Sequence, residues 1–122
     1  KFSILLRILP SSNLTNEVYL VGNWILSNGH FIVPRYSYDT FIFINNCSKF
    51  NELRLTYEDV AGNLDLNFFD AEEGRWKPLG VVFGKGSLEE KSINFDLPSG
   101  KKTLVIGMFS YTDFPIKRIE IS

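Results

Sequence analysis

Residues 51–83 read NELRLTYEDVAGNLDLNFFDAEEGRWKPLGVVF, and this stretch decides the fold class. Apolar residues occupy every second position over 53–57 and again over 64–68, while Arg54, Thr56 and Glu58 alternate with the first set. Because successive side chains of a β-strand point to opposite faces, each segment is predicted to be a strand with one apolar and one polar face. We expect the two strands to join at residues 61–63, a turn at 70–74 and a third strand up to residue 83. The pattern is typical of one half of an antiparallel sandwich.

The rest of the chain repeats the same alternation of short apolar runs and turn residues. Strands are predicted over 2–9, 17–23, 30–33 and 40–44, and again over 91–97, 103–109 and 116–121. Turn signals such as Asn28-Gly29 and Pro98-Ser99-Gly100 separate them, and no window has a convincing helical period. Short strands at this spacing predict an all-β sandwich or barrel. The predicted core consists of Leu53, Leu55, Leu64, Leu66, Phe68, Phe95, Leu104, Ile106 and Ile119.

Length and charge limit the classes of protein that remain. With 122 residues, the chain is predicted to be a single domain spanning 1–122. Thirteen basic and fourteen acidic residues are spread along the sequence without a basic stripe, which argues against a nucleic-acid partner. No apolar run is long enough to span a membrane. Since the sequence starts without Met and ends on a strand pattern, we expect it to be a module of a longer chain.

Catalytic chemistry is difficult to assemble from these residues. His30 is the single histidine, and no GxSxG motif supplies a nucleophile for it. Zinc is unsupported, because Cys47 and His30 have no ligand spacing. The pairs Glu72-Glu73 and Glu89-Glu90 are expected to be solvated charges rather than the two carboxyl groups of a glycosidase. The sequence therefore predicts a protein that is not an enzyme.

Aromatic residues near predicted strand ends give the sharpest functional signal. Flat indole and phenol rings pack against the apolar C–H faces of sugars, and neighbouring polar groups then bind the hydroxyls. The opposing interpretation is that these rings close the ends of the core, as aromatic residues of sandwiches often do. The candidate ligand-binding residues are Trp24, Arg35, Tyr36, Tyr38, Trp76, Tyr111 and Asp113.

Several segments also resemble a known family. LRLTYED (53–59), LDLNFFD (64–70), the turn that precedes Trp76, the Leu97-Pro98-Ser99-Gly100 element and IKRIEI (116–121) follow one another in order. Over residues 51–122 this pattern resembles the galactose-binding-like jelly-roll sandwich found in many carbohydrate-binding modules. VYLVGNW (18–24) is similar to the opening of starch-binding sandwiches, although the usual second tryptophan is missing. It supports sugar-binding sandwiches in general rather than a starch binder.

The resemblance implies an all-β, single antiparallel sandwich of jelly-roll type that binds carbohydrate without catalysis. It also implies a domain appended to a larger extracytoplasmic enzyme or surface protein, located outside the cell or at its surface. The glycosylation patterns at Asn13-Leu14-Thr15 and Asn46-Cys47-Ser48 slightly favour an exported protein. We expect no cofactor other than a structural calcium ion, which sandwiches of this kind often carry. Its candidate ligands here are the loop-side oxygens of Asp59, Asp70, Glu72 and Asp113.

Two other functions remain open on the sequence. The same aromatic residues could form an interaction surface that packs against the parent protein or a partner; such a surface would be a broad apolar patch with few polar groups. A small hydrolase would need a cleft that contains His30 or two facing carboxylates.

Overall fold

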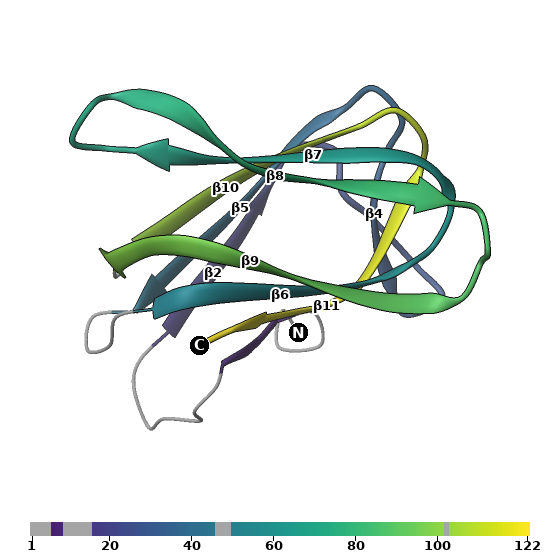
Figure 1. Ribbon diagram of the computed structural model, residues 1–122, viewed down its shortest axis with the longest axis horizontal. Helices are drawn as coiled ribbons and strands as arrows, with labels where there is room; N and C mark the ends of the chain where they lie inside the picture. The colour runs from purple at the N-terminus through teal and green to yellow at the C-terminus, as the bar shows by residue number, and fades with distance from the viewer. Residues whose placement is uncertain (1–5, 9–15, 46–49, 102) are drawn as a thin grey trace.

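The computed structural model describes residues 6–8, 16–45, 50–101 and 103–122, which form two β-sheets that face each other (Figure 1). All pairings are antiparallel except that of β1 with β11, which is parallel. The predicted all-β antiparallel sandwich is thus confirmed. The first sheet has the order β3 (Ile25–Ser27), β4 (His30–Val33), β11 (Phe114–Ile121), β6 (Phe50–Glu58), β9 (Glu90–Lys101), with β1 (Leu6–Ile8) beside β11. The second has the order β2 (Asn16–Val21), β5 (Tyr38–Asn45), β10 (Thr103–Ser110), β7 (Ala61–Asp70), β8 (Arg75–Lys85).

The connections between strands define a jelly roll. From β4 onwards, every connection crosses from one sheet to the other, except that of the β7–β8 hairpin. As a result, the order β4-β11-β6-β9 faces the order β5-β10-β7-β8. Eight antiparallel strands in two sheets with crossing connections are the jelly-roll architecture. The jelly-roll prediction is confirmed.

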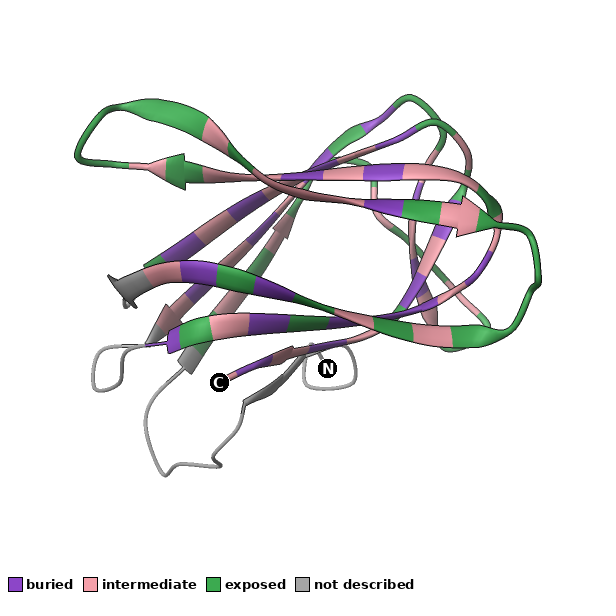
Figure 2. Cartoon of the chain, viewed as in Figure 1, coloured by how far each residue is buried: buried purple, intermediate pink, exposed green. Residues whose placement is uncertain are grey.

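Apolar side chains of both sheets form one core. Figure 2 shows that buried residues alternate with less buried ones along the strands. The alternation predicted for 53–57 and 64–68 is present, since each inward position is buried apart from Phe68. Phe68 is half-buried and packs against the edge of the core. The other predicted core residues are all buried: Leu53, Leu55, Leu64, Leu66, Phe95, Leu104, Ile106 and Ile119.

Two details of the opening stretch differ from the prediction. β6 ends at Glu58 and β7 begins at Ala61, so the junction lies before residues 61–63 and not within them. The two strands also lie in opposite sheets, so residues 51–83 contribute to both halves of the sandwich. Thr56 was expected on a solvated face but is buried, and its hydroxyl is satisfied by that of Ser92, 2.9 Å away on the neighbouring strand β9.

The early β6–β7 junction is explained by Asp59. Its buried carboxylate accepts hydrogen bonds from the Lys85 amide (2.9 Å), the Ser87 amide (3.1 Å) and the Ser87 hydroxyl (2.6 Å). Lys91 Nζ lies 3.4 Å from the same carboxylate. The hydrogen bond from the Ser87 hydroxyl and then that from the Lys85 amide hold the pKa of Asp59 well below its ordinary value. Asp59 therefore ties the β6–β7 junction to the loop that follows β8.

Replacing this anchor is expected to destabilise the fold in a pH-dependent way. Because the pKa of Asp59 is lowered on folding, its contribution is present above the ordinary carboxyl value of 3.8 and is lost as the pH falls through the folded-state value. Asp59→Asn removes the negative charge and replaces one accepting oxygen with an NH₂ group, which then faces other hydrogen-bond donors. We expect a thermal unfolding midpoint several degrees lower at pH 7, with the difference from the unaltered protein shrinking progressively below pH 3.8.

The matched control is Asp96→Asn, which makes the same charge change at an exposed position of β9. Its thermal unfolding midpoint should stay close to that of the unaltered protein both at pH 7 and below pH 3.8. Equal effects of the two substitutions at pH 7 would contradict the anchoring role of Asp59.

Candidate functional site

The outer face of the β2-β5-β10-β7-β8 sheet carries most of the candidate residues. Ile106 and Met108 of the central strand β10 are buried, so Gly107 and Phe109 point outward. Phe109 is paired with Tyr38 of β5 on one side and with Asp65 of β7 on the other. These pairings bring outward side chains of three strands into one row.

Gly107 defines a second row on the same face. It is paired with Thr40 of β5 and with Asn67 of β7, and both of these side chains are half-buried. Its register is regular with both neighbours, so β10 has no bulge at this point. In this row the Thr40 hydroxyl therefore lies on one side of Gly107 and the Asn67 amide on the other, while Gly107 itself has no side chain.

Exposed aromatic rings gather at one end of this face. The rings of Tyr38 and Phe109 lie 4.4 Å apart, and that of Tyr111 meets Phe109 edge-on at 5.0 Å. Tyr36 stacks near Phe109 at 6.5 Å. Exposed fractions of 63% for Tyr36, 79% for Tyr38 and 49% for Tyr111 show that these rings do not serve the core.

Trp76 faces this cluster from the other side of Gly107. Its ring lies so close that a Cβ added at Gly107 would come within 3.0 Å of Cζ3 of the indole. Trp76 belongs to the β7–β8 hairpin, which projects beyond the body of the sandwich (Figure 1), and its ring meets that of Phe69 at 5.4 Å. A register shift after Leu66 changes the pairing of the hairpin at this point.

Between these aromatic walls lies a groove of about 380 Å³. We call it the aromatic groove: Trp76 forms one wall, Tyr38 and Phe109 form the other, and Gly107 lies in the floor with Asn67 beside it. No lysine or arginine is among the described residues that line it. The groove is therefore mainly apolar, with a few polar groups at its floor.

Asp65 and Tyr111 do not line the aromatic groove, but they form a polar pair beside its wall residue Phe109, which is paired with Asp65 and meets the Tyr111 ring. The Tyr111 hydroxyl donates a hydrogen bond to Oδ2 of Asp65 at 3.3 Å. The negative charge of Asp65, followed by partial burial, raises the pKa of Tyr111. The phenol thus stays protonated at neutral pH, and the Asp65 carboxylate lies beside the half-buried ring of Phe109.

The structure brings four of the seven predicted ligand-binding residues onto this face: Tyr36, Tyr38, Trp76 and Tyr111. Arg35 and Asp113 lie next to them. The guanidinium of Arg35 is 5.3 Å from the centroid of the Tyr36 ring, and Asp113 accepts a hydrogen bond from the Arg35 amide at 2.9 Å.

Trp24 occupies a different kind of position. Its indole is half-buried, packs against the core and donates a hydrogen bond to the Thr40 carbonyl at 3.1 Å. It is not among the residues that line the aromatic groove. Trp24 therefore closes one end of the core, which was the opposing interpretation of the aromatic residues.

Sequence reasoning missed five residues of this surface: Thr40, Asp65, Asn67, Phe69 and Phe109. The signal was available, because the outward positions of β7 and β10 alternate with predicted core residues. Proximity to a loop does not select these residues, because all of them lie within strands.

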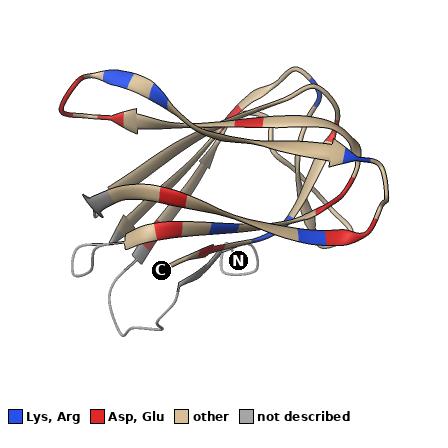
Figure 3. Ribbon diagram, viewed as in Figure 1, with Lys and Arg blue, Asp and Glu red and all other residues tan. Residues whose placement is uncertain are grey.

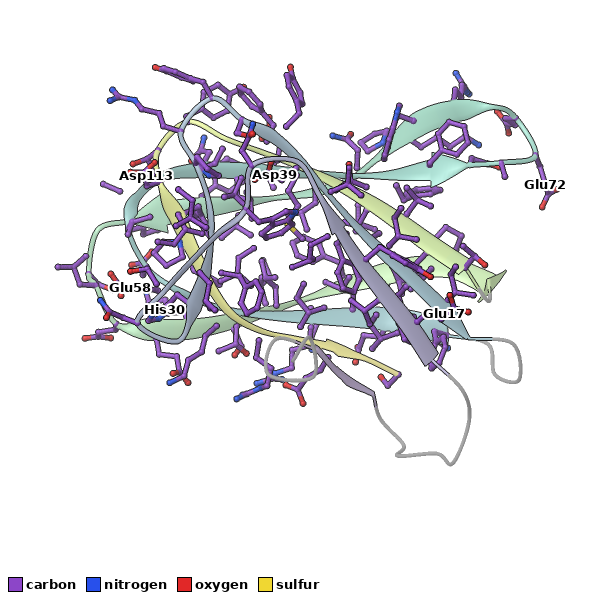
Figure 4. The ribbon with its side chains drawn as sticks, turned by 180° about the vertical axis from the view of Figure 1, so that it is seen from behind. Glu17, His30, Asp39, Glu58, Glu72 and Asp113 are labelled. Carbon is purple, nitrogen blue, oxygen red and sulfur yellow. The ribbon has the colours of Figure 1, made fainter. Side chains whose placement is uncertain are left out.

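The proposed calcium ligands do not converge. Asp59 lies at the β6–β7 junction, Asp70 and Glu72 in the β7–β8 turn, and Asp113 in the β10–β11 loop; Figure 4 shows Glu72 at the tip of the hairpin, far from Asp113. The Lys77 amine lies 2.9 Å from Asp70 and holds the pKa of that carboxyl below its usual range. Across the described residues, no three His, Cys, Asp or Glu side chains come together as a metal site.

The residues considered for catalysis lie outside the aromatic groove. His30 and Glu58 are neighbours (Figure 4), with Nε2 and Oε1 4.0 Å apart, in a pocket of about 100 Å³ on the other sheet. Glu90 of that pocket is 2.6 Å from Lys117, whose hydrogen bond lowers the pKa of Glu90. Acidic and basic residues are scattered over the described strands and loops (Figure 3). Cys47 and the predicted glycosylation sites at Asn13 and Asn46 lie outside the described residues.

The described ranges include no helix with the length and apolar character that crossing a bilayer would require.

Comparison with known proteins gives a fold relationship. No protein-family model matches the sequence, and no curated protein matches it. Among solved structures, two variants of a family 29 carbohydrate-binding module superpose with TM-scores of 0.56 and 0.54. Each match covers 87% of this chain and 79% of the other, at 13% sequence identity. The chain is thus similar in fold to carbohydrate-binding modules, and the resemblance inferred from residues 51–122 is confirmed at the level of the fold.

The close approach of Trp76 to Gly107 can be tested directly. Gly107→Ala adds a methyl group 3.0 Å from the indole, so the ring has to move by a few tenths of an ångström while the sheet stays paired. We expect the indole N–H signal of Trp76 in a ¹H–¹⁵N spectrum to shift clearly. The Trp24 signal should move much less, because its N–H is held by the Thr40 carbonyl. An unchanged Trp76 signal would contradict the described packing.

Proposed function

We propose that this chain is a non-catalytic carbohydrate-binding domain and that the aromatic groove is its sugar-binding surface. The observation that carries the proposal is the pair of aromatic walls, exposed Trp76 on one side and exposed Tyr38 with half-buried Phe109 on the other, above a floor that holds polar groups. The similarity in fold to structures described as carbohydrate-binding modules supports it.

The chemistry of the groove suits a sugar. A pyranose ring offers apolar C–H faces to flat aromatic rings, and the walls present such rings at low conformational cost. Its hydroxyl groups need hydrogen-bond partners, which Asn67 and Thr40 on the floor and Asp65 beside Phe109 can provide. A small number of polar groups in an apolar cleft can orient a neutral ligand. An anionic ligand would need positive charge, and no lysine or arginine is among the described residues that line the groove.

The position of the ionisable residues supports a binding role without catalysis. Of the residues considered for hydrolysis, His30 and Glu90 lie in the small pocket of the other sheet. Glu73 in the β7–β8 turn is engaged by Lys77 Nζ at 2.7 Å and by Arg75 at 3.1 Å. A glycosidase needs two carboxyl groups facing each other across the sugar. Of the two carboxyl groups closest to the aromatic groove, Asp65 is hydrogen-bonded by Tyr111 outside the lining, and Asp39 is buried and accepts hydrogen bonds from the Asn23 amide and the Ser37 hydroxyl.

We also propose that the domain is a module of a larger protein that acts outside the cell or at its surface. The solved structures with a similar fold are themselves described as modules, and the glycosylation patterns at Asn13 and Asn46 are compatible with export. In that setting the domain would hold its parent enzyme or surface protein on a glycan.

The proposal predicts that binding depends on the two aromatic walls. Trp76→Ala and Tyr38→Ala each remove an exposed ring, so affinity for a glycan should fall about tenfold or more. The unfolding midpoint should change little, because both rings are largely outside the core. A glycan array identifies the bound sugar, and isothermal titration calorimetry with that sugar gives the affinities.

Phe83→Ala is the matched control, since Phe83 is an exposed ring of the same sheet that does not line the aromatic groove. It should bind as the unaltered protein does. A domain that is folded but retains no glycan on the array, or whose binding survives the loss of both wall residues, would overturn the proposal. Failure on the array together with stable association with a partner protein would favour the interaction module.

A further inference from the structure

The connection between β4 and β5 contains an unusual backbone conformation. Residues 34–37 form a tight turn closed by a hydrogen bond from the Ser37 amide to the Pro34 carbonyl at 3.1 Å. Tyr36, the third residue of this turn, has a φ of 59°. A positive φ at the third position of a turn is the place where glycine or asparagine is favoured, because a Cβ is strained there.

Two contacts hold this conformation in place. The Tyr36 amide donates to the Ser110 carbonyl at 2.7 Å, and the Arg35 amide donates to Oδ1 of Asp113 at 2.9 Å. Ser110 and Asp113 flank the β10–β11 loop, so that loop fixes the β4–β5 turn. A strained residue persists only where its surroundings over-determine it, and such residues concentrate at functional sites.

The strained conformation does not serve the core. The Tyr36 ring is 63% exposed and lies 6.5 Å from both the half-buried ring of Phe109 and the exposed ring of Tyr111. Arg35 covers the ring at 5.3 Å. The turn therefore places the Tyr36 ring beside Tyr38 and Phe109, which form one wall of the aromatic groove.

This placement lengthens the site along β10. Gly107, Phe109 and Tyr111 follow one another at every second residue on or just beyond this strand, so the surface from Trp76 above Gly107 to Tyr111 extends over about 14 Å. Tyr36 lies at the far end of that surface. A row of rings of this length fits several linked sugar units better than a single one.

We propose that Tyr36 forms an outer subsite of the aromatic groove for a sugar chain of several units, and that Asp113 is a positioning residue that holds Tyr36 there. The inference rests on the proposed carbohydrate-binding function and adds the length of the ligand and the role of the clamp. Asp113 contacts no sugar in this scheme; it acts through the Arg35 amide.

The test compares ligands of different length. The probes are linear oligosaccharides of two to six β-1,4-linked glucose, mannose or xylose units, titrated calorimetrically into the unaltered protein and three variants. Tyr36→Gly removes the ring and relieves the positive φ, Asp113→Ala removes the acceptor of the Arg35 amide, and Asp113→Asn keeps an oxygen acceptor at that place.

We expect the affinity of the unaltered protein to rise with chain length up to the longest probes. Tyr36→Gly and Asp113→Ala should bind the disaccharide as the unaltered protein does but lose about tenfold on the hexasaccharide, and Asp113→Asn should restore most of that loss. Tyr36→Gly should unfold at the same temperature or higher, because relief of strain offsets the loss of a mostly exposed ring.

The outcomes separate the two proposals. If the unaltered protein binds neither the probes nor any glycan of the array, or if Trp76→Ala and Tyr38→Ala both leave binding unchanged, the carbohydrate site fails and the outer subsite fails with it. If it binds a glycan of the array but its affinity does not rise with chain length, only the outer subsite is overturned. If Trp76→Ala lowers the affinity about tenfold or more while Tyr36→Gly and Asp113→Ala keep the full dependence on length, only the outer subsite is overturned. A drop of the unfolding midpoint in Tyr36→Gly, with equal losses for short and long probes, would assign Tyr36 a structural role and also overturn it.

Discussion

The hydrogen-bonded position of β10 between β5 and β7 is the constraint on which the rest of the structure depends. A strand with partners on both sides cannot rotate, so its buried residues Ile106 and Met108 fix the outward direction of Gly107 and Phe109. Core packing on one side of this strand therefore determines the position of the ligand surface on the other. Because Gly107 has no side chain, the Trp76 ring can come close enough to face the rings of Tyr38 and Phe109 across the groove.

Aspartate side chains hold several of the turns that surround this framework. Asp59 binds the loop after β8, Asp70 accepts from the amides of Glu72 and Glu73 within the β7–β8 turn, and Asp113 binds the turn before β5. Buried Asp39 accepts hydrogen bonds from the Asn23 amide (2.7 Å) and the Ser37 hydroxyl (2.9 Å). A sandwich with so many crossings needs such local anchors, because its connecting segments have little apolar area of their own to bury.

The sequence was informative where one physical rule dominates. Period-two alternation over 53–57 and 64–68 predicted strands and core residues correctly, and the Asp70–Gly74 turn followed from its residue types. The partition of strands between the two sheets was not readable, because a turn at residue 59 looks the same locally whether the chain folds back or crosses over. For the same reason, Trp24 and Trp76 were equivalent as candidates, although the first closes the core and the second lines the groove. Exposure is a property of tertiary packing, and no local pattern distinguishes the two.

The crossing connections have a kinetic consequence. Among the described strands, only β7–β8 and the short β3–β4 pair are consecutive along the chain and also neighbours in one sheet. Most other pairings therefore unite segments that are distant in sequence, as in the contact of β5 with β10. Closing such large loops costs entropy before any contact compensates for it. Sandwiches dominated by non-local pairing refold over about milliseconds to seconds. We therefore expect the hairpin that carries Trp76 to be able to form early, while the opposite wall of the groove has to wait until the last strands have found their neighbours.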